Sequence, residues 1–173
     1  MESVATQIAR RVERLKVLVV DDDPRMRKVV RALLQVIGIR DIHEARDGQS
    51  GLATICARAP DLVILDWEMP SPNGPEFMRM VRSPGTFPLP DVPVIMLTGY
   101  SERSRVAEAM RLGVNEYLLK PVSSTALLAR IVSILAKPRP MIKQGDYYGP
   151  EPRPSAIYRP EPDPDFDRVF FVN

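Results

Sequence analysis

Residues 17–26 read VLVVDDDPRM, in which four apolar residues are followed at once by Asp21, Asp22, Asp23 and Pro24. The apolar run has the length and the β-branched character of a buried strand. Adjacent carboxylates at the end of such a run repel one another, so each resists ionisation unless a cation compensates the charge. Asp23 and Pro24 have a simpler explanation, because aspartate is a favoured helix N-cap and proline favours the first helical position. The stretch therefore predicts a strand, then an acidic pair that requires a cation (Asp21 and Asp22), then the start of a helix.

The same alternation of short apolar runs and helical patterns repeats along the chain. Strands are predicted at 17–20, 42–45, 62–65, 94–97 and 117–119. Helices are predicted at 25–37, 49–59, 75–82, 102–112 and 124–136. Five strands that are each followed by a helix form a parallel sheet with helices on both faces. We therefore predict an α/β fold with a doubly wound five-stranded parallel sheet, whose functional site lies at the carboxyl ends of the strands.

Composition excludes several classes of function. The 173 residues suffice for one compact domain, and a formal net charge of +2 without a basic stripe gives no electrostatic footprint for nucleic acid. A single cysteine excludes an intramolecular disulfide framework and suits a reducing cytosol. No apolar run approaches the about 20 residues of a membrane span, and the N-terminus lacks the apolar core of a signal peptide. We expect a cytoplasmic protein that binds neither nucleic acid nor membrane.

Two segments flank the repeated pattern, which occupies residues 16–136. Residues 1–15 carry apolar side chains at helical spacing and predict an amphipathic helix that packs on the domain or a partner rather than on a membrane surface. Residues 137–173 hold eight of the eighteen prolines and show no helix or strand period, which predicts an extended, proline-rich tail. Alternating acidic and apolar residues at 165–173 indicate either a short docking motif or a terminus that folds back on the domain.

Reactive side chains end four of the five predicted strands. They are Asp21 and Asp22 after the first strand, Asp66 after the third, Thr98 after the fourth and Lys120 after the fifth. Oxygen ligands without histidine or cysteine favour Mg²⁺ or Mn²⁺ over zinc. Such a site suits phosphate chemistry, in which Asp66 attacks phosphorus, Lys120 neutralises a phosphoryl oxygen and Thr98 donates a hydrogen bond.

Four motifs, VLVVDDDP, DLVILDWEMP, VIMLTGY and YLLKPVS, occur in this order and resemble the signatures of the receiver domain of bacterial two-component response regulators. The resemblance covers roughly residues 16–136 and implies the flavodoxin-like strand order 2-1-3-4-5. It implies that Asp66 is the phosphoacceptor. It also implies that Asp21, Asp22, Asp66 and the backbone carbonyl of Glu68 bind the metal ion.

The resemblance assigns further roles on the last two strands. Lys120 would act with Asp66 in phosphoryl transfer, and both Thr98 and Lys120 would contact the phosphoryl group. Tyr117 matches the aromatic residue that changes rotamer on activation. Tyr100 and Glu68 flank the path by which water attacks the phosphorylated carboxylate, so we expect them to tune dephosphorylation.

The resemblance implies a phosphorylation-controlled signalling switch rather than an enzyme. A histidine kinase or histidine phosphotransfer protein would supply the phosphoryl group, and the chain resembles the single-domain, chemotaxis-type members of the family. Output would pass to an unidentified protein target through the face formed by 102–112, 117–119 and 124–136, which is also the surface expected for a homodimer.

Three other readings stay open. The chain could relay the phosphoryl group onward or serve as a phosphate sink. A haloacid-dehalogenase-like phosphatase also forms an aspartyl phosphate, but that family expects a second aspartate where Glu68 stands. A pure interaction module is the third reading, and the full acidic set argues against it.

Overall fold

The computed structural model describes residues 2–100 and 103–153, so position 102 of one predicted helix and the segment 154–173 lie outside the described residues. The elements in chain order are α1 (Val4–Glu13), β1 (Lys16–Val20), α2 (Pro24–Ile37), β2 (Asp41–Ala45), α3 (Gly48–Arg58), β3 (Leu62–Asp66), α4 (Gly74–Val81), β4 (Val94–Thr98), α5 (Arg103–Arg111), β5 (Glu116–Leu119), α6 (Ser124–Ala136), β6 (Met141–Gln144) and β7 (Tyr147–Pro150). Every strand and helix predicted between residues 16 and 136 is present, with ends that differ by at most one residue. No helix in the described ranges is long and apolar enough to span a membrane.

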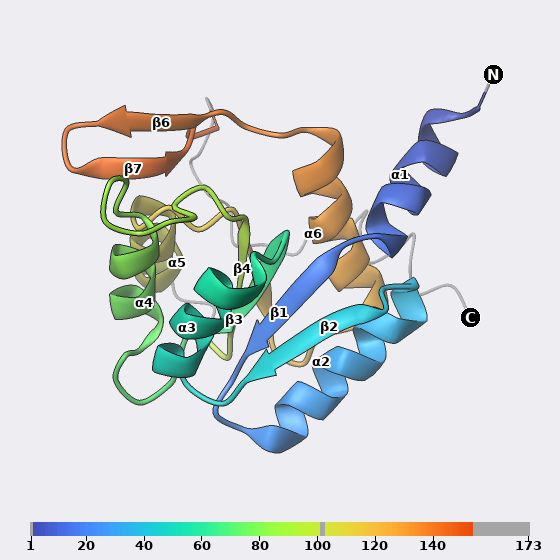
Figure 1. Cartoon of the computed structure of the whole chain (residues 1–173), viewed down its shortest axis with the longest axis horizontal. Coiled ribbons are helices and arrows are strands. Elements are labelled where there is room, and N and C mark those ends of the chain that lie inside the picture. The colour runs from blue at the N-terminus through green and yellow to red at the C-terminus, as the bar shows by residue number, and fades with distance from the viewer. Residues whose placement is uncertain (1, 101–102, 154–173) are drawn as a thin grey trace.

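The five strands β1–β5 form one parallel sheet in the order β2-β1-β3-β4-β5, which confirms the predicted doubly wound topology. Helices α3, α4 and α5 cover one face, and α2 and α6 cover the other (Figure 1). The central strands β3 and β4 are buried along their whole length, because helices pack on both of their sides. This arrangement places the carboxyl ends of β1, β3, β4 and β5 along one edge of the molecule.

The turn between β1 and α2 separates the three aspartates by role. Asp23 is the N-cap of α2, and its side chain accepts a hydrogen bond of 2.9 Å from the backbone N–H of Arg25. Pro24 is the first helical residue, as its fixed φ favours. The helix-start explanation of Asp23 and Pro24 is therefore confirmed, and Asp21 and Asp22 remain for the strand end.

Helix α1 packs on the same side of the sheet as α6. Its residue Val12 and the following Leu15 are buried in the core beneath α2 and α6. Arg11 donates a hydrogen bond of 3.1 Å to the backbone carbonyl of Leu135 near the end of α6. The C-terminal part of the N-terminal helix thus packs on the domain, whereas Val4 at its start is largely exposed.

The prediction of a tail without strands after residue 136 is wrong for the described part of that segment. Strands β6 and β7 form an antiparallel hairpin across a two-residue turn, Gly145 and Asp146, in which Gly145 has a φ of 59°. The hairpin lies over the C-terminal end of α5 (Figure 1). There a Cβ on Gly113, whose φ is +87°, would stand 2.8 Å from the carbonyl oxygen of Tyr148. The close approach requires glycine at this position.

Candidate functional site

Three carboxylates meet at the carboxyl ends of β1 and β3. Asp21, Asp22 and Asp66 each offer an oxygen atom, and these atoms lie within 4.8 Å of one another. Asp21 and Asp66 are buried, whereas Asp22 is exposed. The parallel topology brings them together, because β1 and β3 are neighbours in the sheet.

The surroundings of Asp21 in this cluster disfavour its ionised form. Its Oδ1 accepts a hydrogen bond of 2.9 Å from the backbone N–H of Asp23. Its Oδ2 is buried and has no hydrogen-bond partner among the described residues. Burial raises the pKa of Asp21 to about 6, the Asp23 N–H opposes that rise, and the nearby Asp66 carboxylate adds to it. A buried carboxylate oxygen without a donor, close to two other carboxylates, is the arrangement that a cation would complete.

Lys120 supplies the cation that the described residues place beside Asp66. It follows β5, and its Nζ lies 2.8 Å from Asp66 Oδ1. Partial burial by itself lowers the pKa of Lys120, but the hydrogen bond and charge of Asp66, together with the charges of Asp21 and Glu68, outweigh it and raise the pKa above its usual value. The lysine is therefore held as a cation against the Asp66 carboxylate.

Thr98 ends β4 within hydrogen-bond reach of the loop that follows Asp66. The hydroxyl is fully buried and donates a hydrogen bond of 2.5 Å to Glu68 Oε1. The backbone N–H of Tyr100 donates to the same hydroxyl oxygen over 3.2 Å. Sequence reasoning placed Glu68 beside the site through its backbone carbonyl and its position, and it missed this side-chain contact. Sequence carried no signal for this contact, because it depends on the side-chain conformation of Glu68, an exposed residue in the loop after β3.

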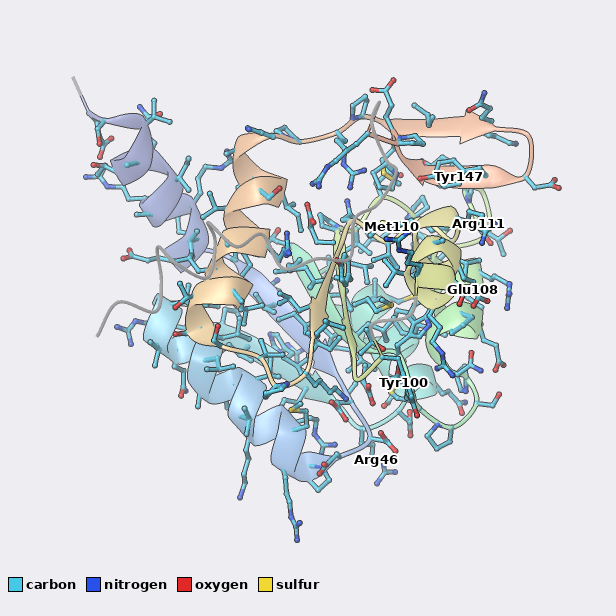
Figure 2. The ribbon with its side chains drawn as sticks, turned by 180° about the vertical axis from the view of Figure 1, so that it is seen from behind. Arg46, Tyr100, Glu108, Met110, Arg111 and Tyr147 are labelled. Carbon is cyan, nitrogen blue, oxygen red and sulfur yellow. The ribbon has the colours of Figure 1, made fainter. Side chains whose placement is uncertain are left out.

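Two aromatic residues lie outside this polar cluster. Tyr100 is 47% exposed, and the Arg105 guanidinium of α5 stacks over its ring at 4.1 Å from the centroid. Figure 2 shows Tyr100 at the end of α5 that faces the carboxyl ends of the strands, away from Tyr147 of the hairpin. Tyr117 lies on β5, half-buried, with the Arg130 guanidinium of α6 at 5.8 Å from its ring centroid. The structure thus groups six of the predicted residues in the polar cluster and places these two at its margin.

An open pocket of about 390 Å³ adjoins the cluster between the segment after β3 and helix α5. Trp67 and Glu68 line the pocket on the side of the segment after β3, and Arg105 and Glu108 line it on the side of α5. Gly74, at the start of α4, allows the segment between β3 and α4 to pack closely against Trp67, because a Cβ at this position would stand 2.3 Å from the indole ring. The pocket leaves the region around Glu68 open to solvent and to another molecule.

Comparisons with known proteins agree with this fold. Residues 17–132 match the response regulator receiver domain family. The chain is 33% identical over 123 residues to the chemotaxis protein CheY of Pseudomonas aeruginosa, which covers 71% of this chain and 98% of that protein. Among solved structures, a putative response regulator from Chloroflexus aurantiacus superposes with a TM-score of 0.65 at 30% identity, covering 71% of this chain and 98% of the other.

A third comparison supports the fold alone, because its identity is 24%. It is the receiver domain of a sensor histidine kinase from Pseudomonas aeruginosa, with a TM-score of 0.63 over 71% of this chain and 98% of the other. That structure carries a magnesium ion coordinated in its active-site cleft.

The chain belongs to the response regulator receiver domain family. It is therefore a phosphorylation switch and a regulator rather than a classical enzyme, and its family membership implies a histidine kinase as a partner. The acidic cluster of Asp21, Asp22 and Asp66 is consistent with metal-dependent phosphorylation of an aspartate.

Proposed function

We propose that Asp66 accepts a phosphoryl group from a phosphohistidine of a histidine kinase or histidine phosphotransfer protein. One carboxylate oxygen of Asp66 attacks phosphorus in line, the phosphorus–nitrogen bond breaks, and its electron pair stays on the departing imidazole. The observation that carries this role is the 2.8 Å contact between Lys120 Nζ and Asp66 Oδ1 inside the acidic cluster. Lys120 then neutralises charge on the transferring group. Mg²⁺-dependent incorporation of one phosphoryl group from a small phosphodonor, lost when Asp66 is replaced, tests this function.

The donor set fits a hard divalent cation. We propose that Asp21, Asp22, Asp66 and the backbone carbonyl of Glu68 hold Mg²⁺, or Mn²⁺ in its place. The described side chains that form the acidic cluster offer only carboxylate oxygens, and the buried Oδ2 of Asp21 has no hydrogen-bond donor among the described residues. The ion would neutralise the carboxylates and withdraw charge from a phosphoryl group bound at Asp66.

Magnesium affinity is expected to fall at acidic pH, because the pKa of Asp21 is raised to about 6. A proton on Asp21 competes with the cation, so the Mg²⁺ affinity should fall roughly tenfold between about pH 7 and pH 5. In the metal-free protein the folded state holds this proton more tightly than the unfolded chain. The corresponding stability is fully present below about pH 4 and is lost as the pH rises through about 6. Calorimetric Mg²⁺ titrations measure the affinity, and equal values at the two pH values would contradict the assignment of Asp21.

The switch that we propose begins at Thr98. In this structure its hydroxyl is bound to Glu68, so a phosphoryl oxygen on Asp66 must compete with that carboxylate for the hydroxyl hydrogen bond. The dianionic phosphoryl group also repels Glu68. Thr98 would move to the phosphoryl group, and Tyr117 would turn into the space it leaves. The result is a changed surface on α5, β5 and α6, the two-state element through which such a switch signals.

Tyr100 and Glu68 are proposed to control how long the phosphoryl group stays on Asp66. The backbone N–H of Tyr100 contacts the Thr98 hydroxyl, and the Tyr100 ring, held by Arg105, would shield the acyl phosphate from water. Tyr100→Ala is expected to lose its phosphoryl group several-fold faster than the wild type, whereas Tyr100→Phe keeps the ring and the wild-type rate. The decay is followed as inorganic phosphate release after removal of the phosphodonor. A Tyr100→Ala rate equal to or below that of the wild type would refute the shielding role.

The output of the switch is a change in protein–protein contacts. We propose that a downstream protein binds the α5–β5–α6 face. Both this binding and the phosphoryl transfer from the histidine kinase would take place in the cytoplasm. A homodimer through the same face stays a prediction.

A further inference from the structure

The described chain ends beside the face that the proposed switch controls. After α6 the hairpin returns to the end of the sheet where β4 and β5 begin. Arg139 donates a hydrogen bond of 2.6 Å to the backbone carbonyl of Asn115, and the Tyr148 hydroxyl donates to Asp91. Arg153, the last described residue, then forms an ion pair with Glu116, the first residue of β5. The segment 154–173 therefore starts at the edge strand of the sheet.

A short chain of contacts joins that starting point to Tyr117. Glu116 is 4% exposed, so its ion pair with Arg153 is largely shielded from solvent on the carboxylate side. The same carboxylate accepts a 3.0 Å hydrogen bond from Ser133 of α6 and lies 4.0 Å from the Arg130 guanidinium. Arg130 in turn lies over the Tyr117 ring. Movement of Tyr117 would shift Arg130 and Glu116. It would therefore also alter the ion pair of Arg153, at which the segment 154–173 starts.

The α5–β5–α6 face and the segment 154–173 are complementary in character. The three elements carry four arginines against two glutamates and expose two leucines, Leu119 and Leu128, by 38% and 36%. The segment carries four acidic residues against two arginines, with three phenylalanines, Phe166, Phe170 and Phe171, near its end. Acidic and aromatic side chains suit a basic surface with exposed apolar positions.

The segment is long enough to reach the whole face. Its 20 residues span up to about 66 Å when extended, whereas the 13 residues of α6 rise about 20 Å. Because it is anchored at Arg153, its local concentration at the face is on the order of millimolar, so even weak contacts would be populated.

We propose that residues 154–173 bind the α5–β5–α6 face of their own chain in the unphosphorylated protein, and that phosphorylation releases them. The release rests on the proposed function, whereas the binding itself does not. Coupling between two binding events is reciprocal, so a bound segment also disfavours phosphorylation. The segment thus acts as an intramolecular competitor for whatever protein the activated face binds.

Hydrogen exchange on the full-length chain tests the binding. The test variant combines Phe166→Ser, Phe170→Ser and Phe171→Ser, and the matched control is Tyr158→Ser, which alters an aromatic residue of the segment outside the phenylalanine cluster. We expect amides of β5 and α6 to exchange several-fold faster in the test variant than in the wild type or the control, at every protein concentration. Phosphorylating the wild type should produce the same increase.

Two outcomes overturn the proposal. Unchanged exchange in the phenylalanine variant means that the segment does not cover the face, and protection that grows with protein concentration means that a second copy covers it. Phosphoryl incorporation measured on the same samples separates this proposal from the proposed function. Normal incorporation with unchanged exchange removes only the intramolecular contact, whereas absent incorporation with segment-dependent protection removes only the function.

Discussion

Asp66→Asn is expected to abolish the phosphoryl incorporation that the wild type gains from a small phosphodonor and Mg²⁺. An amide has nearly the shape of the carboxylate but is a poor nucleophile, so the substitution removes the attacking atom while it keeps the packing of a residue that is 3% exposed. Loss of one negative charge from the crowded cluster also relieves repulsion, so the variant should fold. Intact-protein mass measures the incorporation directly.

The matched control is Asp146→Asn in the turn of the hairpin, where the carboxylate is exposed and far along the chain from the acidic cluster. It should incorporate one phosphoryl group like the wild type, and chelation of Mg²⁺ with EDTA should stop incorporation in both. Persistent labelling of Asp66→Asn would mean that another residue is the acceptor.

Arg82→Met is expected to lower the free energy of unfolding by about 3–5 kcal/mol, a large part of the stability of an ordinary domain. The guanidinium is buried and donates hydrogen bonds to the carbonyls of Gly113 (3.0 Å), Pro90 (2.6 Å) and Val92 (2.7 Å). It also donates to Asn115 Oδ1 over 2.9 Å. Burial lowers the pKa of Arg82 to about 10, so it stays charged at neutral pH.

Methionine fills much of the same volume but leaves the buried carbonyls without a donor, which is the costly case for a buried hydrogen-bonding group. Gly113 also contacts the hairpin, and Asn115 accepts a hydrogen bond from Arg139 just before it, so the anchoring of the hairpin should weaken as well. Urea unfolding measures the difference, with Arg79→Met on the exposed side of α4 as the control, expected to change stability by less than about 0.5 kcal/mol. A loss below about 1 kcal/mol for Arg82→Met would show that the arginine is dispensable to the fold.

The sheet and the polar cluster were predictable from sequence because both follow from local signals. Strands covered on both faces give short continuous apolar runs, such as 62–65 and 94–97, whose length and flanking residues favour a strand over a helix. Parallel strands then place whatever follows them along one edge, so Asp66 and Lys120 could be brought together without knowledge of any contact.

The hairpin was missed although it left a signal. Gly145 and Asp146 form a two-residue Gly-Asp turn between Gln144 and Tyr147, which is a recognised hairpin pattern. The high proline content of the segment obscured it. Pro150 is nevertheless compatible with a strand, because it ends β7 in a sheet of only two strands, where no further ladder bond is required of it.

Other features depend on contacts that sequence spacing does not encode. The acceptors of Arg82 lie between 8 and 33 positions away and are mostly backbone carbonyls, which any residue type supplies. The Thr98–Glu68 hydrogen bond likewise depends on the side-chain conformation of an exposed loop residue. The sequence therefore predicts the backbone topology, but it does not predict contacts that depend on side-chain conformation.

Locating the phosphoryl group is the most direct test of the central claim. Borohydride reduces an aspartyl phosphate to the primary alcohol homoserine, which marks the acceptor covalently and survives proteolysis. After phosphorylation with a small phosphodonor and Mg²⁺, peptide sequencing by mass spectrometry should find homoserine at position 66 and unmodified aspartate at positions 21 and 22. Homoserine at position 21 or 22, or a phosphoryl group that borohydride does not convert, would contradict the account.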